Sequence, residues 1–296
     1  MKTISRRKFL QTSVAGAAAA STVLFPGQNK AFAGKEKIDM VDLGKTGIKV
    51  SRIAWGTGTK GHKHSSRQTK IGVKEFYKIT DHAYECGINF FDSADQYGTH
   101  TYFRSALKNH PRDKIVVLTK MWTNPSDWMK TMPVSKFLEI SLKELDMDYI
   151  DIVLLHCMTS ATWPTEKESF CNDLAEAKQK GLIRAHGVSC HSLPALQAAA
   201  KSEWADVIFA RFNNTGDYMD HYPKTVTPVL KAAKKRGAGV VGMKIFGNGK
   251  LVSDKQRQSS LKFVLGSNAV NAMTIGFEST DQITDAIKRV NKILKG

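Results

Sequence analysis

The amino-acid sequence predicts a closed barrel of eight parallel β-strands, each followed by an α-helix. Short runs rich in β-branched residues alternate with amphipathic stretches eight times between residues 52 and 294, with no long linker between them. Such alternation requires a parallel sheet with right-handed crossovers, and eight units favour a closed (β/α)8 barrel over an open doubly wound sheet. In addition, no G-x-G-x-x-G motif follows a strand and opens a helix, which argues against an open dinucleotide-binding sheet.

Residues 1–33 have three ordered features of an export signal. A twin-arginine motif, Ser5–Leu10, precedes an Ala-rich apolar stretch over Val14–Leu24, and Ala31–Ala33 forms an A-x-A cleavage site. We therefore expect the twin-arginine (Tat) export machinery to deliver residues 34–296, as a single domain, to the periplasm or otherwise out of the cytoplasm. A basic tail ahead of a surface helix is the alternative. The apolar stretch is too short to span ~30 Å of hydrocarbon, so no stable membrane anchor is expected.

The charge balance is strongly basic. The formal net charge is +17, and the predicted signal carries five Lys and Arg and no acid, so residues 34–296 carry +12. A basic surface can attract nucleic acid or anionic lipid. However, the Lys and Arg are scattered over predicted helices without a nucleic-acid-binding motif, so no nucleic acid partner is expected.

Cysteine and histidine spacing gives little support for a metal site. The four cysteines form no C-x-x-C pair, which makes a zinc or iron–sulfur site improbable, and their spacing leaves open whether any disulfide forms. His62 and His64 have metal-like spacing, but they lie in a glycine-rich loop. We therefore expect no bound metal.

The strands are read from continuous β-branched runs bounded by turn residues, the pattern of buried parallel strands. Ahead of them, an N-terminal hairpin over Ile38–Val50 is predicted to turn at Gly44–Gly47, because Gly-Lys-Thr-Gly is typical of a turn. The eight predicted strands are Arg52–Trp55, Ile88–Asp92, Lys114–Lys120, Tyr149–His156, Ala185–Ser189, Val207–Phe212, Gly239–Lys244 and Ala272–Ile275.

Each predicted strand is followed by a stretch with helical periodicity. The first of these carries an apolar stripe that includes Phe76, Ile79 and Ala83, and glycines at positions 181 and 237 act as stop signals for two others. The predicted helices are Val73–Cys86, Tyr102–Asn109, Val134–Leu145, Lys167–Lys180, Leu193–Lys201, Val226–Arg236, Asp254–Leu265 and Thr280–Leu294.

Three of the apolar strands end in a polar residue with acid–base chemistry. Asp92 ends the second strand, with Tyr97 five residues further on, Lys120 ends the third strand and His156 ends the fourth. In a barrel of parallel strands, side chains at the strand C-terminal ends converge on one mouth. A carboxylate, a phenol, an ammonium and an imidazole would therefore meet there, and such a set is suited to proton transfer.

Several longer segments carry a recognisable pattern. Gly87–Gly98, which reads GINFFDSADQYG, is the most specific, and Gly181–Ser189 is a second; Leu43–Ser51 and Gly56–Thr59 complete the set. Together they resemble the aldo/keto reductase family over nearly all of residues 37–292. The resemblance implies a (β/α)8 barrel, in agreement with the alternation, and a nicotinamide-dependent oxidoreductase that interconverts a carbonyl and an alcohol.

The resemblance also assigns roles to the four polar residues. It makes Tyr97 the proton donor and His156 the group that orients the carbonyl oxygen. A free tyrosine has a pKa of ~10, so Lys120 is expected to lower the pKa of Tyr97 by favouring the phenolate, and Asp92 is expected to hold Lys120 charged and oriented.

By the same resemblance the cofactor is NADP or NAD, with the preference left open. Ser189 matches a serine that contacts the nicotinamide, but Cys190 stands where an asparagine is usual, and Met243 stands where an aromatic is common. Gln282 replaces an arginine that grips a 2′-phosphate, which weakens the case for NADP. The expected cofactor-binding residues are Gly58, Thr59, Ser189, Cys190, Met243, Lys244, Gly247 and Gln282.

The substrate is expected to be a small carbonyl or sugar-like compound. Trp122 and Trp163 follow the third and fourth strands and are predicted to wall the substrate pocket, because aromatic rings stack on apolar or sugar faces. The sequence thus predicts an NAD(P)-dependent aldo/keto reductase. The alternative is a non-catalytic barrel that binds nicotinamide or a small ligand as a sensor or partner subunit.

Overall fold

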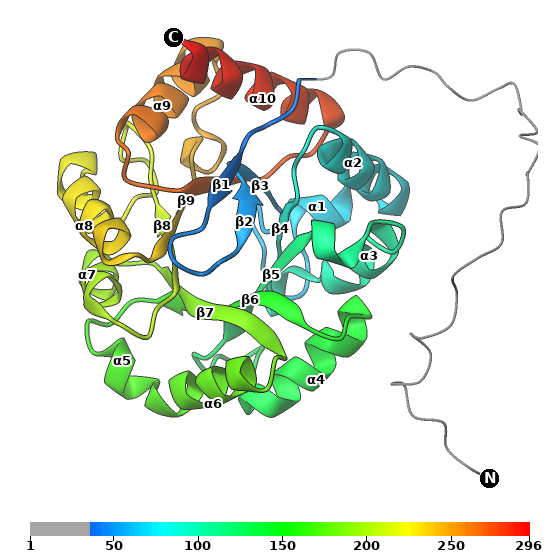
Figure 1. The fold of residues 1–296 in the computed structure, drawn as a ribbon, viewed down its shortest axis with the longest axis vertical. Helices are drawn as coiled ribbons and strands as arrows, with labels where there is room; N and C mark the ends of the chain where they lie inside the picture. Colours follow the sequence, from blue (N-terminus) through cyan, green and yellow to red (C-terminus); the bar gives the residue numbers. More distant parts are fainter. Residues whose placement is uncertain (1–35) are drawn as a thin grey trace, which may run out of the picture. The chain divides into compact units, whose positions relative to one another are not determined.

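A computed structural model describes residues 36–296, and the predicted export signal lies outside the described residues. Eight parallel strands close into a barrel in the order β10-β3-β4-β5-β6-β7-β8-β9, and the helices surround it (Figure 1). The predicted fold class is therefore confirmed. The barrel strands are β3 (Ile53–Gly56), β4 (Phe90–Asp92), β5 (Val116–Trp122), β6 (Ile150–Met158), β7 (Ile183–Cys190), β8 (Val207–Arg211), β9 (Gly239–Met243) and β10 (Ala272–Ile275).

The helices agree with the predicted alternation, with short additions. The larger ones are α2 (Val73–Glu85), α3 (His100–Ala106), α4 (Val134–Leu145), α6 (Glu168–Gln179), α7 (Leu193–Lys201), α8 (Pro223–Arg236), α9 (Asp254–Gly266) and α10 (Thr280–Lys295). The short ones are α1 (Arg67–Lys70), α5 (Trp163–Glu166) and the 3₁₀ turns η2 (Asp95–Tyr97), η3 (Arg112–Lys114) and η4 (Gly247–Gly249).

Two separate apolar cores stabilise the barrel, because side chains alternate between its faces along each strand. Phe90, Leu118, Leu154 and Phe209 point inward and fill the barrel. Neighbours of opposite parity, such as Phe91, pack outward against the helices. This alternation decides which residues at a strand end face the mouth.

The predicted N-terminal hairpin is present as β1 (Met40–Asp42) and β2 (Lys49–Ser51), which pair antiparallel. Figure 1 shows the hairpin across the centre of the barrel in that view. Its Leu43, Ile48 and Val50 are fully buried with the inward-facing core residues. The hairpin therefore closes one end of the barrel, and the mouth with the strand C-terminal ends is left for a ligand.

Two strands extend further than their apolar runs predict. β5 continues to Trp122 and β6 to Met158, each two residues beyond the polar residue taken as the strand end. Trp122 pairs with His156, so the β5–β6 pairing continues beyond Lys120. On the other side of β6, the register of its pairing with β7 shifts between Leu155 and Met158. Polar residues are thus tolerated inside these strands, because they face the mouth. Over the described residues, no helix combines the length and apolar character needed to cross a membrane.

Candidate active site

Three of the four predicted acid–base residues lie on neighbouring strands with their side chains inside the barrel. Asp92, Lys120 and His156 have the same inward parity as Phe90, Leu118 and Leu154 on β4, β5 and β6. All three are at most 4% exposed. Strand alternation and parallel pairing therefore place a carboxylate, an ammonium and an imidazole in one buried layer.

Lys120 and Asp92 form a buried ion pair. The Lys120 ammonium donates to Asp92 Oδ1 and to the carbonyl oxygen of Ser93 at 2.7 Å. Thr274 on β10 donates from Oγ1 to the other carboxylate oxygen of Asp92 at 2.8 Å. A buried charge pair is stable only when its remaining hydrogen-bonding groups are also satisfied. Sequence reasoning missed Thr274, although its position near the end of the last strand was a usable signal.

Tyr97 is positioned by a tight turn and two glycines. It ends η2, and Gly98 follows in the left-handed conformation, with φ 69°, where an added Cβ would lie 2.1 Å from the His64 carbonyl oxygen. The Tyr97 ring packs against Gly58 and Gly61, since a Cβ on either would come within 2.4 Å of ring atoms. The Tyr97 hydroxyl lies 3.3 Å from His156 Nε2.

The electrostatics of Tyr97 differ from the prediction. Burial raises the pKa of Tyr97 well above its ordinary value, and the Asp92 carboxylate raises it further. The net shift is therefore opposite to the lowering expected from Lys120, because burial is its largest cause. The Lys120 ammonium is bound to Asp92 and lies 4.8 Å from the Tyr97 ring centroid. Tyr97 therefore remains a neutral phenol, the form that can donate a proton.

His156 is also uncharged. Burial lowers the pKa of His156 well below its ordinary value, and the nearby Lys120 charge lowers it further. A neutral imidazole 3.3 Å from the Tyr97 hydroxyl can exchange a hydrogen bond with that hydroxyl or with an oxygen placed between them. The two groups thus form a neutral hydrogen-bonding pair, supported by a charged pair beneath it.

A cavity of about 590 Å³ leads from Tyr97 and the Lys120–Asp92 pair along the ends of β9 and β10 to the first turn of α10. Its size is in the range of small-molecule and cofactor sites. The inner end is lined by Asp92, Tyr97 and Lys120. The rest is lined by residues of three segments, Gly56–Thr59, 243–252 and 274–286, and by Arg67 and Arg257.

The expected cofactor-binding residues divide into two groups. Gly58, Thr59, Met243, Lys244 and Gln282 line the cavity. The Lys244 side chain donates to Asn248 Oδ1 at 3.2 Å, and burial lowers its pKa. The cavity has the size of a cofactor site, and its lining combines an apolar side chain, Met243, with a cation, Lys244.

The other three expected residues do not line the cavity. Cys190 is wrong as a contact because its side chain, fully buried, points outward into the helix-facing core. Ser189 has the inward parity, but its Oγ accepts from the backbone N–H of Cys157 at 2.9 Å. Gly247 is buried behind the cavity wall, where an added Cβ would lie 3.1 Å from the Asp217 side chain.

The two predicted substrate-pocket tryptophans have different positions. Trp122 lies over the site, with its ring centroid 5.7 Å from that of His156. Trp163 is 1% exposed, donates to the Ala195 carbonyl oxygen and packs on Trp204 in the helix layer. Its expected role as a pocket wall is therefore wrong, because α5 turns the side chain toward the core.

Sequence reasoning missed a second aromatic residue at the mouth. Trp128 lies with its ring centroid 6.4 Å from that of Trp122 and 4.4 Å from that of His62. His62 therefore packs on an aromatic ring, and across the described residues no group of three or more candidate ligands could hold a metal ion. The available signal was that two tryptophans, Trp122 and Trp128, follow the predicted third strand within eight residues.

Substitution of Gly58 by alanine is expected to displace Tyr97. The added Cβ would lie 2.2 Å from the Tyr97 ring, closer than any tolerated contact. A displacement of about 1 Å costs about 10²-fold in rate when a reacting group must be held in position. The measurement is kcat for the carbonyl reduction that the sequence predicts. Gly266→Ala is the control, since its Cβ would meet nothing within 4 Å; equal rates in the two variants would contradict the assigned position of Tyr97.

Comparisons with known proteins agree with this fold. The model of the aldo/keto reductase family matches residues 52–295. The methylglyoxal reductase DkgB of Salmonella typhi is 28% identical over 180 residues, which is 58% of this chain and 62% of that protein. The chain therefore spans less than two thirds of that relative.

Two further matches cover more of both chains. L-galactose dehydrogenase of Arabidopsis thaliana is 24% identical over 297 residues, which is 87% of this chain and 89% of that protein. The holo form of an aldo-keto reductase from Bacillus halodurans has a TM-score of 0.69 at 20% identity, and the match covers 87% of this chain and 96% of that one. This structural match supports the fold.

Proposed function

The chain belongs to the aldo/keto reductase family, and from this premise we propose that it is a nicotinamide-dependent enzyme that reduces an aldehyde or ketone, or oxidises the matching alcohol. One observation carries the proposal. Tyr97, whose hydroxyl lies 3.3 Å from His156 Nε2, lines one end of a cofactor-sized cavity together with the buried Lys120–Asp92 pair.

Each residue of the site has a specific task in this reaction. NAD(P)H, when bound, supplies the hydride that reduces the carbonyl carbon. Tyr97 donates the proton that the carbonyl oxygen needs as negative charge develops there. His156, held neutral, donates a hydrogen bond to the same oxygen and fixes its position. The Lys120 ammonium, oriented by Asp92, stabilises the phenolate that Tyr97 becomes after it has given up its proton.

The side chains at the mouth favour a small carbonyl or sugar-like compound as the substrate. Trp122, Trp128 and His62 form an aromatic wall next to His156. Such rings stack on apolar or sugar faces, while the Tyr97–His156 pair supplies directional hydrogen bonds.

The direct test is consumption of reduced cofactor by purified protein with NADH or NADPH and a panel of small aldehydes. The proposal expects substrate-dependent loss of reduced cofactor. Cofactor binding without turnover on any carbonyl would contradict catalysis and favour the sensor or partner-subunit alternative.

Reduction is expected to be independent of pH between about pH 7 and about pH 9. Tyr97 must be protonated to act, and its pKa is raised above the ordinary 10.0, so it remains protonated through this window. His156 must be neutral, and its pKa is lowered below the ordinary 6.5, so it remains neutral. The measurement is kcat/KM at saturating cofactor. An inflection near pH 8 that disappears in Tyr97→Phe would contradict this electrostatic account.

We also propose that residues 1–33 direct export through the twin-arginine pathway, because that stretch carries a twin-arginine motif, an apolar stretch and an A-x-A site in order. Intact-mass measurement of protein from the periplasm should show a chain that begins at Gly34. Arg6→Lys/Arg7→Lys should stay in the cytoplasm at full length. Full-length wild-type protein found only in the cytoplasm would contradict export.

A further inference from the structure

The end of the cavity remote from Tyr97 is formed by the region where α9 and α10 begin. Six residues there carry the charge and hydrogen-bonding groups: Arg67, Arg257, Glu278, Asp281, Gln282 and Asp285. Because Tyr97, Lys120 and Asp92 line the opposite end, this region would hold the adenosine half of a dinucleotide. Carboxylates outnumber cations in this lining by three to two.

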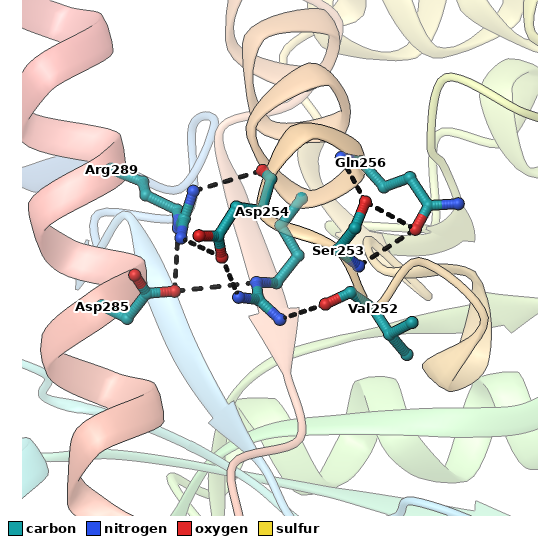
Figure 2. Close-up of polar contacts among 7 residues, drawn as sticks. Val252, Ser253, Asp254, Gln256, Asp285 and Arg289 are labelled. Atoms are coloured by element: carbon teal, nitrogen blue, oxygen red, sulfur yellow. Dashed lines mark hydrogen bonds and ion pairs between the residues drawn. The ribbon is translucent and has the colours of Figure 1, made fainter.

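Arg257 is not free to bind a ligand anion. One of its terminal nitrogens donates to the Val252 carbonyl oxygen at 2.6 Å and the other to Asp254 Oδ1 at 2.5 Å. Its Nε lies 3.7 Å from Asp285 Oδ2. Arg289 joins the same two acids, with contacts of 2.8 Å to Asp254 and to Asp285 (Figure 2). Two arginines and two aspartates thus form a closed network at the α9–α10 junction.

The other cation, Arg67, lies 3.4 Å from the Glu278 carboxylate. Gln282 is engaged as well, because its side-chain carbonyl accepts from the backbone N–H of Glu278 at 2.8 Å. The start of α10 is capped by Ser279, whose Oγ accepts from the Gln282 N–H at 3.3 Å. The groups that could attract a phosphate are therefore already paired with protein atoms.

Asp281 differs from these residues. It lies exposed in the first turn of α10 and lines the cavity. Within residues 36–296, no side-chain hydrogen bond or ion pair of 4 Å or less involves its carboxylate. A helix N-terminus attracts negative charge, and in this chain a protein carboxylate already occupies that favourable region.

We propose that this cavity selects a dinucleotide whose adenosine ribose carries a free 2′-hydroxyl, NAD(H), over one with a 2′-phosphate, and that Asp281 is the main residue that excludes the phosphate. A 2′-phosphate brings about −1.5 to −2 charges, which would face carboxylates at an end of the cavity where both arginines of the described lining are already paired. A 2′-hydroxyl can instead donate a hydrogen bond to a carboxylate. This inference rests on the proposed function.

The test is calorimetric titration of the full-length protein with NADH and NADPH, and with their adenosine fragments AMP and adenosine 2′,5′-bisphosphate. NADH and AMP should bind at least about tenfold more tightly than their 2′-phosphorylated partners. The ratio should fall as NaCl increases, because repulsion between partly exposed charges is screened by salt.

Two variants identify the residue responsible. Asp281→Asn should tighten NADPH binding about three- to tenfold and change NADH binding by less than about threefold. Asp281→Asn/Gln282→Arg should reverse the preference, because an added guanidinium binds phosphate strongly. The matched controls, Asp173→Asn and Gln179→Arg, make the same two kinds of substitution on α6, outside the cavity. They should leave the ratio of NADH to NADPH affinity unchanged.

The outcomes separate this inference from the proposed function. Equal or tighter binding of NADPH by the wild type would overturn the inference while the oxidoreductase proposal stands. If Asp281→Asn changes the ratio of the two affinities no more than Asp173→Asn does, the role of Asp281 is overturned. Failure of both dinucleotides to bind would overturn the inference and the proposed function together.

Discussion

Tyr97→Phe is expected to reduce the rate of carbonyl reduction by about 10²- to 10⁴-fold, the usual contribution of a positioned proton donor. Phenylalanine retains the ring that packs against Gly58 and Gly61 and removes only the hydroxyl 3.3 Å from His156. The fold and the cofactor cavity should therefore be unchanged, and NADH or NADPH should bind as in the wild type.

The measurement combines steady-state kinetics with cofactor titration by fluorescence. The loss should appear in kcat as well as in kcat/KM, because the proton is transferred only in the chemical step. Tyr102→Phe is a matched control, since its hydroxyl on α3 donates to the Thr69 carbonyl oxygen at 3.4 Å. Comparable kcat values in the two variants would show that Tyr97 is not the proton donor.

Lys120→Met is expected to destabilise the protein by about 3–5 kcal/mol and to abolish turnover. Asp92 is only 4% exposed, so the variant would leave its carboxylate buried without an opposite charge. Removal of one partner from a buried ion pair costs far more than the pair itself contributes. The measurement is the free energy of unfolding from urea denaturation, together with kcat.

A double variant distinguishes the unpaired charge from lost packing. Asp92→Asn/Lys120→Met removes both charges, so it should recover much of the stability while remaining inactive. Lys136→Met is the control for an exposed pair, because Lys136 and Glu139 are each more than half exposed, and it should cost less than about 1 kcal/mol. If Lys120→Met costs no more than Lys136→Met, the buried-pair account is wrong.

The fold was predictable because it depends on local patterns. Apolar runs rich in β-branched residues, such as Ile150–Leu155, alternate with helical stretches, and that alternation leaves few topologies for a parallel sheet. The convergence of Asp92, Lys120 and His156 was predictable for the same reason, since the C-terminal ends of parallel strands share one mouth.

The errors concern side-chain direction and environment. Cys190 follows Ser189 in the chain, but the period of two along β7 turns its side chain outward. Trp163 follows β6, but its local helix directs the ring into the core. The pKa of Tyr97 depends on burial, the largest cause of its shift, which no spacing of residues reveals.

The measurement that tests the central claim most directly is isotope transfer. Full-length protein is incubated with an aldehyde that it turns over and with NADH or NADPH carrying deuterium at both C4 positions of the nicotinamide, and the alcohol product is analysed by NMR. Hydride transfer within the Tyr97–His156 site predicts one deuterium on the carbinol carbon of each product molecule, and product formed about 10²- to 10⁴-fold more slowly with Tyr97→Phe. Alcohol product without deuterium on that carbon would contradict the account.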